Sequence, residues 1–143
     1  MYGFAECYRN TNNKTFLDAS RRLAEYAINR LPPDLVPYWD YDSPLIPNDV
    51  RDSSAASILS SGLLILAEQD NANAERWHHV ATLLLESLWK NYSSRGTGEP
   101  SILIHGTRSK PHGMMDHGLI YGDYYFVEAL TQLAKDSDKT PNL

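Results

Sequence analysis

The sequence has only one cysteine, Cys7, among its 143 residues. A single cysteine excludes an internal disulfide and any zinc site built from several cysteines. Long hydrophobic runs are also absent, because the longest wholly apolar stretch covers residues 63–67, whereas a membrane-spanning helix needs about 20. The first residues show no basic segment followed by an apolar one, so we expect no signal peptide and, by default, a cytoplasmic location.

Basic residues are fewer than acidic ones. The 13 Lys and Arg residues and the 18 Asp and Glu residues give a net charge of -5. We therefore expect neither nucleic acid nor an anionic membrane as a partner. The sequence also lacks a GxSxG nucleophile motif, a GxGxxG motif and a Walker-type phosphate loop. What remains is an ordinary globular composition, 42% hydrophobic and 22% charged, in a length that suits one domain.

Helical periodicity dominates the chain. Apolar residues spaced three and four apart predict helices over residues 2–10, 14–31, 53–68, 74–92 and 122–135. Helix N-caps are expected at Asn13 and at either Asp52 or Ser53. The segment 53–68 is apolar nearly all round, which is typical of a buried helix, whereas 74–92 is amphipathic. This alternation predicts an all-α fold with two layers, about five helices and two long loops.

The two long loops cover residues 32–51 and 93–120. The first carries five of the eight prolines but also the aromatic residues Tyr38, Trp39 and Tyr41. Loops longer than about 12–15 residues within a compact domain are usually functional or disordered, and aromatic residues are scarce in disordered segments. We therefore expect the first loop to be ordered.

Metal-binding patterns are weak. His78 and His79 are adjacent on a helix, so their side chains point in different directions. The second loop gathers three histidines near two carboxylates, namely His105, His112, His117, Asp116 and Asp123. No HxH or HxxxH spacing supports a metal site there. We predict no metal and no other cofactor, and favour a polar rim that binds a hydrophilic ligand.

Carboxylates and aromatic residues leave two interpretations open. Glycosidases use a pair of Asp or Glu side chains, but the loops offer too many possible pairs to choose one. For Asp52 we favour a helix-capping role, and Asp123 also lies near a predicted helix start. Aromatic residues beside carboxylates at 37–42 and 121–126 suit a sugar ring, although those at 37–42 could equally plug the ends of helices.

Several motifs occur together in one order and spacing: Pro37-Tyr38-Trp39-Asp40, Arg51-Asp52-Ser53-Ser54-Ala55-Ala56, Ser61-Gly62-Leu63-Leu64, His105-Gly106, Leu119-Ile120-Tyr121-Gly122-Asp123-Tyr124-Tyr125-Phe126 and Glu128-Ala129-Leu130. In this combination the chain resembles the unsaturated glucuronyl hydrolases of glycoside hydrolase family 88. The resemblance implies an (α/α)6 barrel, or toroid, of six helical hairpins. Residues 1–135 would form the carboxyl-terminal part of this single domain, and residues 136–143 a frayed tail.

The resemblance also implies a glycosidase activity in carbohydrate metabolism. Members release a 4,5-unsaturated uronic acid from the non-reducing end of oligosaccharides made by polysaccharide lyases. An aspartic acid protonates the vinyl ether at C4, water adds at C5, and the hemiketal collapses. The family's catalytic aspartates lie upstream of the matching segment. We therefore assign no catalytic residue and expect the isolated chain to be inactive.

Substrate-binding residues are implied on the aglycone side of the pocket: His105, Asp116, His117, Tyr121 and Tyr124. Asp116 and His117 lie where family members vary, so the preferred aglycone stays open. Two alternatives also remain open. The related unsaturated rhamnogalacturonyl hydrolases share the fold and chemistry, and the chain could instead be a stand-alone, non-catalytic helical module that binds carbohydrate or another protein.

Overall fold

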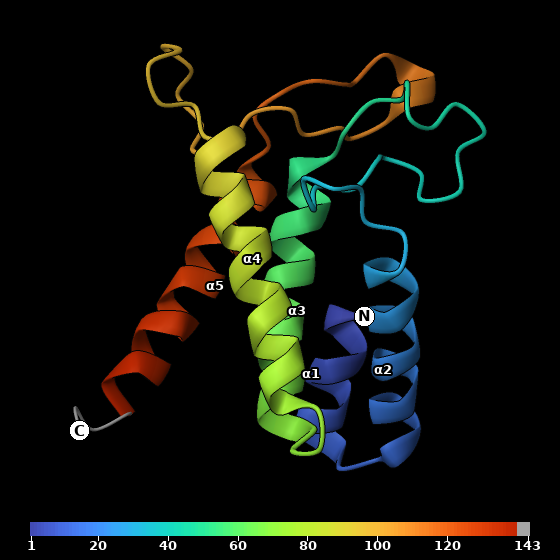
Figure 1. Cartoon of the computed structure of the whole chain (residues 1–143), viewed down its shortest axis with the longest axis vertical. Helices are drawn as coiled ribbons and strands as arrows, with labels where there is room; N and C mark the ends of the chain where they lie inside the picture. Colours follow the sequence, from blue (N-terminus) through green and yellow to red (C-terminus); the bar gives the residue numbers. More distant parts are fainter. Residues whose placement is uncertain (140–143) are drawn as a thin grey trace.

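The computed structural model describes residues 1–139, and over that range the fold is all-α (Figure 1). Five α-helices and one 3-10 helix follow one another: α1 (Tyr2–Thr11), α2 (Lys14–Ile28), α3 (Ser53–Gln69), α4 (Ala74–Asn91), η1 (Lys110–His112) and α5 (Ile120–Lys139). The predicted fold class and the five predicted helices are confirmed. The short helix η1 lies inside the second long loop and was not predicted.

Helix starts follow local capping chemistry. The side chain of Asn13 accepts a hydrogen bond from the Thr15 amide at 3.0 Å, and that of Asp52 accepts one from the Ser54 amide at 3.1 Å. Each bond satisfies one of the amides that a helix leaves without a partner in its first turn. Both predicted N-caps are confirmed.

Helix ends differ from the sequence-based bounds. The helix α2 stops at Ile28 rather than at residue 31, because the residue before a proline disfavours helical geometry and Pro32-Pro33 follows closely. The helix α5 begins at Ile120 and continues to Lys139, four residues past the predicted end. No proline interrupts it before Pro141. Residues 136–139 thus belong to α5, and residues 140–143 of the expected tail lie outside the described part.

The helices form two layers. One layer holds α1, α3 and α5, with α3 packed against both neighbours, while α2 packs on α1 and α4 packs on α3. In Figure 1, α4 covers α3 and α2 stands beside α1. The central helix α3 is buried around most of its circumference, including the run Leu63–Leu66. The sequence-based prediction of a buried helix over 53–68 is confirmed.

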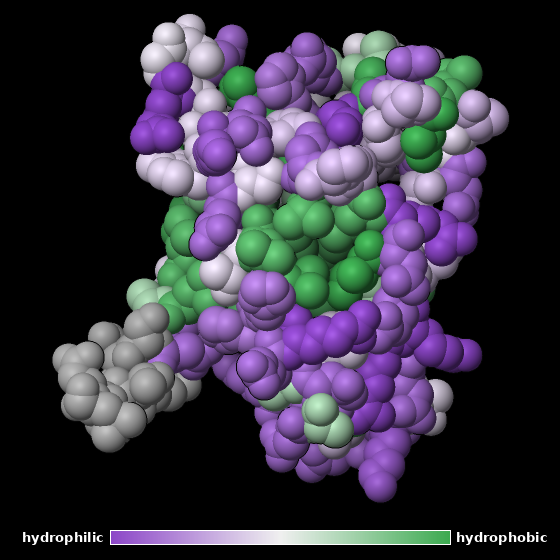
Figure 2. Space-filling model, in the orientation of Figure 1, coloured by the Kyte–Doolittle hydropathy of each residue, from purple (hydrophilic) through white to green (hydrophobic). Residues whose placement is uncertain are grey.

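The outer side of α5 is largely uncovered. Ile120, Tyr124, Val127 and Leu130 are 84%, 60%, 48% and 43% exposed. A second hydrophobic area lies elsewhere, across the middle of the face on which α4 covers α3, and is bordered by hydrophilic surface (Figure 2). Between α4 and α5 lies an apolar cavity of about 290 Å³ whose lining includes Leu85, Trp89, Phe126, Leu130 and Leu133. None of the helices described through residue 139 is long and apolar enough to cross a membrane.

Candidate functional site

The two long loops meet at one end of the helical layers, where α3 and α5 begin and α4 ends (Figure 1). Isolated antiparallel bridges hold the loops in place. One of them pairs Gly106 with His117, whose amides and carbonyls exchange hydrogen bonds of 2.8 and 2.9 Å. Because His105 and Asp116 flank this bridge on adjoining segments, the bridge brings them side by side.

His105 and Asp116 form a hydrogen-bonded pair through Nδ1 of the imidazole and Oδ1 of the carboxylate. Both residues have a backbone φ of 61°, in the left-handed region that few non-glycine residues adopt. The His105 carbonyl accepts the Ser53 amide at the start of α3 at 3.1 Å, and the ring meets the Tyr92 ring edge-on at 5.8 Å. Unusual backbone geometry held by surrounding structure is frequent at ligand-binding sites.

Two cavities share the His105–Asp116 pair as a wall. The first, of about 430 Å³ and called here the loop cavity, is lined by Thr97, Glu99, Pro100, Ser101, Ile104, His105, Asp116, His117 and Gly118. The second, of about 400 Å³, is lined by Asp34, Val50, Arg51, Asn91, Tyr92, His105, Thr107 and Asp116. Most of these residues are polar, so the arrangement offers many hydrogen-bonding groups to a hydrophilic ligand.

The structure groups the five predicted binding residues unevenly. His105, Asp116 and His117 line the loop cavity together. Tyr124 lines a different cavity, of about 680 Å³, along the exposed side of α5. Tyr121 is 37% exposed and lines none of these three cavities. The binding role of all five residues stays a prediction.

Tyr124 belongs to a cluster centred on Glu128. The Tyr124 hydroxyl and the Tyr2 hydroxyl each donate to Glu128 Oε1 at 3.3 Å, and the Ser61 hydroxyl donates to Oε2. The negative charge of Glu128 raises the pKa of Tyr124 above its ordinary value. The cluster joins α1, α3 and α5, which fixes the position of the Tyr124 side chain on its helix.

The aromatic segment at 37–42 contributes to packing more than to an open platform. Tyr38 is 6% exposed and donates its hydroxyl to the Pro47 carbonyl at 3.1 Å. The guanidinium carbon of Arg51 lies 4.2 Å from the centroid of the Tyr38 ring. The sequence left open whether these aromatic residues bind a sugar ring or plug the end of a helix. The buried position of Tyr38 favours the second interpretation.

Several cavity residues were not singled out from the sequence. Asp34 pairs with Arg51 at 2.9 Å and accepts the Tyr92 hydroxyl at 2.8 Å. Burial and the hydrogen bond to Asp34 raise the pKa of Tyr92. Asp34 and Tyr92 are 58 residues apart, so no local motif signals their contact. Arg51 belongs to one of the motifs that carry the family resemblance, but the sequence does not indicate that Asp34 is its partner.

The two capping interpretations have different outcomes. Asp52 caps α3 as predicted, and its Oδ1 also accepts the Thr107 amide at 3.2 Å, which links the cap to the second loop. Asp123 does not start its helix, because α5 begins three residues earlier. Its carboxylate instead accepts the amides of Ile102 and Leu103 at 3.0 and 2.9 Å. Asp123 thus fastens the second loop to α5.

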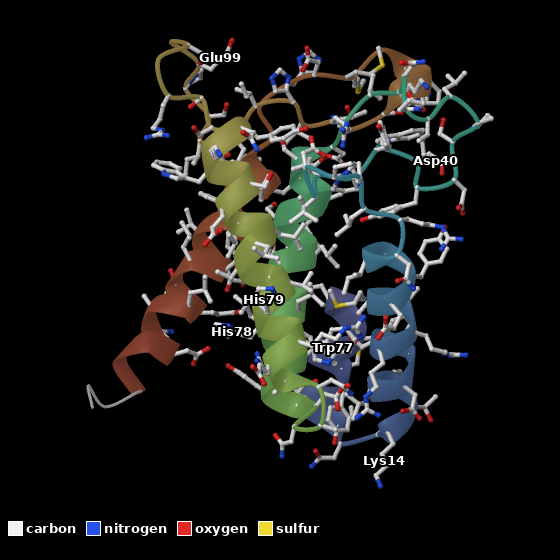
Figure 3. The ribbon with its side chains drawn as sticks, in the orientation of Figure 1. Lys14, Asp40, Trp77, His78, His79 and Glu99 are labelled. Carbon is white, nitrogen blue, oxygen red and sulfur yellow. The ribbon has the colours of Figure 1, made fainter. Side chains whose placement is uncertain are left out.

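The adjacent histidines His78 and His79 lie in the half of α4 farther from the loops, as their labels in Figure 3 show. His79 is exposed and His78 is partly buried. Within residues 1–139, no three His, Cys, Asp or Glu side chains are grouped so that they could hold a metal ion.

Comparison with known proteins identifies relatives of one kind, although no family model matches the chain. An unsaturated glucuronyl hydrolase of Bacillus sp. (strain GL1) is 36% identical over 140 residues, which cover 94% of this chain and 37% of the relative. An unsaturated chondroitin disaccharide hydrolase of Streptococcus pneumoniae is 37% identical over 146 residues, which cover 95% of this chain and 36% of that relative.

Solved structures agree with the sequence matches. The crystal structure of an unsaturated glucuronyl hydrolase specific for heparin superposes with a TM-score of 0.89 at 30% identity, over 96% of this chain and 38% of that chain. A variant of the Streptococcus agalactiae unsaturated glucuronyl hydrolase, complexed with dGlcA-GalNAc6S, has a TM-score of 0.86 at 30% identity. The match covers 94% of this chain and 37% of that chain. The chain thus spans about 37% of the length of the relatives that it matches.

Proposed function

We propose that this chain, a partial homologue of the unsaturated glucuronyl hydrolases, supplies oligosaccharide-binding loops to an enzyme of that type. The enzyme would release 4,5-unsaturated uronic acid from the non-reducing end of lyase-generated oligosaccharides. The expected reaction adds a proton at C4 of the vinyl ether and water at C5, after which the hemiketal opens and the aglycone leaves. It requires a proton donor and a water molecule.

The observation that carries the proposal is the homology over 94% of the chain with the fold preserved at a TM-score of 0.87. The match extends over nearly all of the chain, and so includes most of its two long loops. Because the chain spans only 33–37% of the length of these curated relatives, the activity and the substrate are proposed for the assembled fold. Residues 1–135 would form one part of a single (α/α) barrel.

The geometry suits a binding role rather than a catalytic one. His105 and His117 can donate to or accept from sugar hydroxyls, and Asp116 can accept from them. Tyr124 presents a ring that is 60% exposed, next to the Glu128 carboxylate, which suits the apolar face of a sugar. Tyr121 would contribute a similar surface at the same helix start. No residue of this chain is proposed as the proton donor.

A chimera tests the proposal directly. This chain would replace the matching portion of the Bacillus sp. GL1 hydrolase, and turnover would be followed as the loss of ultraviolet absorbance from the C4–C5 double bond. We expect an active chimera, in which Asp116→Ala lowers kcat/KM for an unsaturated disaccharide about tenfold. The matched control is His79→Ala on the exposed side of α4, which should leave kcat/KM unchanged. A folded but inactive chimera would contradict the proposed function.

The isolated chain provides a second readout. We expect it to leave the absorbance of an unsaturated disaccharide unchanged, because none of its residues is assigned as the acid that protonates C4. Turnover by the chain alone would show that the catalytic acid lies within these residues.

A further inference from the structure

One end of the helical array, formed by α1 and α2, exposes an apolar ridge. The side of α2 that carries Glu25 faces α4, since Glu25 accepts a hydrogen bond from Arg76 at 2.7 Å. Leu23 lies two residues earlier, about 200° around the helix, so its side chain points away from α4, and it is 39% exposed. Phe4 of α1, 40% exposed, stacks on Phe16 of α2 with ring centroids 6.1 Å apart. The ridge of Phe4, Phe16 and Leu23 is called here the amino edge.

The other end, formed by α4 and α5, is hollowed rather than ridged. There the exposed side of α5 borders the apolar cavity of about 290 Å³ between α4 and α5. This surface, called here the carboxyl edge, consists of Trp89, Ile120, Tyr124, Val127 and Leu130. Among residues 1–139, no further helix packs on either edge. An apolar ridge that enters an apolar hollow removes both surfaces from water, which favours their contact.

The inner layer of the chain supplies half of a ring. The helices α1, α3 and α5 run in the same direction (Figure 1), and α3 packs against both of the others. The barrel of the relatives is built from six hairpins and so has six inner helices. Two copies of this chain, with three inner helices each, reach that number. If α1 of a second copy lies beside α5, it continues the layer just as α3 continues it beyond α1.

We propose that the 143-residue chain forms a closed two-fold dimer, in which the amino edge of each copy seats against the carboxyl edge of the other. In a two-fold pair this contact occurs twice, so both edges of both copies are covered. Pairing of α5 with α5 would instead leave Phe4 and Leu23 in water. The partner that fits both edges is therefore a second copy of this chain. The inference goes beyond the proposed function and rests on packing alone, so its test needs no substrate.

Sedimentation velocity of the natural chain gives the first test. We expect a single dimeric species at micromolar concentration, which does not grow into larger species as the concentration rises, because a closed pair leaves no free edge. A chain that stays monomeric up to about 100 micromolar, where even a weak specific dimer forms, would overturn the docking of the edges. A series of steadily growing oligomers would overturn the closure of the pair.

Two variants, each with one edge disabled, distinguish this arrangement from pairing through α5 alone. One combines Phe4→Lys with Leu23→Lys, and the other combines Val127→Lys with Leu130→Lys. All four side chains are 39–48% exposed, so both variants should keep the helical circular dichroism of the natural chain. We expect each variant alone to be monomeric. An equimolar mixture should form heterodimers through the one intact contact, with a Kd at least about tenfold weaker than that of the natural dimer.

The matched control is Asn48→Lys with Asn71→Lys, which adds two lysines at exposed positions outside both edges and should leave the dimer intact. Leu23→Gln adds no charge and should weaken the natural dimer about tenfold, which keeps the test available if paired lysines impair folding. Dimerisation of the variant with Phe4→Lys and Leu23→Lys by itself would show that the amino edge takes no part. A mixture that remains monomeric would show that the two edges do not meet, and either result overturns the proposal.

Discussion

Among single residues, Asp70 is a buried carboxylate whose hydrogen bonds connect the end of α3 to α2 and α4. It is 1% exposed and accepts hydrogen bonds from Arg21 Nε and Nη2 at 3.0 and 2.7 Å, from Asn73 at 2.9 Å and from the Trp77 indole at 2.9 Å. Burial alone would raise its pKa, but these donors outweigh burial and lower the pKa to about 2. The carboxylate therefore stabilises the junction of α2, α3 and α4 while it is ionised.

Replacing this carboxylate should destabilise the fold in a pH-dependent way. We expect Asp70→Asn to lower the free energy of unfolding by about 3 kcal/mol at neutral pH, because it leaves Arg21 without its buried partner. The native pKa lies below the ordinary value, so the stabilisation is present above about pH 4 and is lost as the pH falls towards 2. Urea unfolding between pH 7 and 3 would show a weaker acid dependence for the variant than for the natural chain.

The control for this prediction is Asp18→Asn. Asp18 also bonds Arg21, at 3.2 Å, but its side chain is 65% exposed, so its loss should cost less than about 1 kcal/mol. Similar losses for both variants would show that burial of Asp70 does not govern its contribution.

Replacement by alanine should change stability in opposite directions at two glycines. A methyl group at Gly118 would overlap the Ser101 side chain beside the loop cavity, whereas one at Gly3 in α1 would meet no atom within 4 Å. Gly118→Ala should therefore destabilise the chain by about 1–3 kcal/mol, and Gly3→Ala should stabilise it by about 0.5–1 kcal/mol. Urea unfolding of the two variants checks both signs, and stabilisation by Gly118→Ala would contradict the close contact.

At the scale of elements, the pair of Asp49 and Lys110 connects the first long loop to η1 in the second. Asp49 also accepts the Ser43 hydroxyl and the Val50 amide at 2.7 Å. The hydrogen bond from Lys110 and the other donors lower the pKa of Asp49 to about 2. This contact therefore holds from neutral pH down to about pH 4 and weakens as the pH falls through 2.

Removing the cation should loosen the loops without unfolding the helices. We expect Lys110→Met to speed amide hydrogen exchange at least about tenfold in residues 43–50 and 106–117, because local opening no longer breaks an ion pair. Exchange in α3 should stay the same. Lys90→Met, which removes an exposed lysine in the last turn of α4, is the control. Uniformly faster exchange in the loops and in α3 would contradict a local role.

The sequence allowed some of these elements to be predicted because their determinants are local. Asn13 and Asp52 cap helices through amides two residues away, so the capping pattern is readable in the chain. Asp123 could not be interpreted in this way, because its partners Ile102 and Leu103 lie about 20 residues upstream. The Asp34–Tyr92 contact spans 58 residues, and only the folded loops bring it into the site.

The whole molecule shows a regular pattern that α5 interrupts. In the helices described up to residue 139, α1 is covered by α2 and α3 is covered by α4, while no corresponding helix covers α5. The uncovered side carries the apolar residues Val127 and Leu130 and borders the cavity between α4 and α5. A monomeric soluble protein seldom leaves a large contiguous apolar surface in contact with water.

We therefore expect the isolated chain to self-associate at micromolar concentration, because pairing of these surfaces removes apolar area from water. The double variant Val127→Lys and Leu130→Lys should remain monomeric in sedimentation velocity and keep its helical circular dichroism, since both side chains are already more than 40% exposed. Thr11→Lys with Lys14→Gln alters an exposed turn without touching α5 and is the control. If the natural chain is instead a monomer that unfolds cooperatively, the two-layer core around α3 is sufficient by itself, and the interpretation as a stand-alone helical module gains support over that of one part of a barrel.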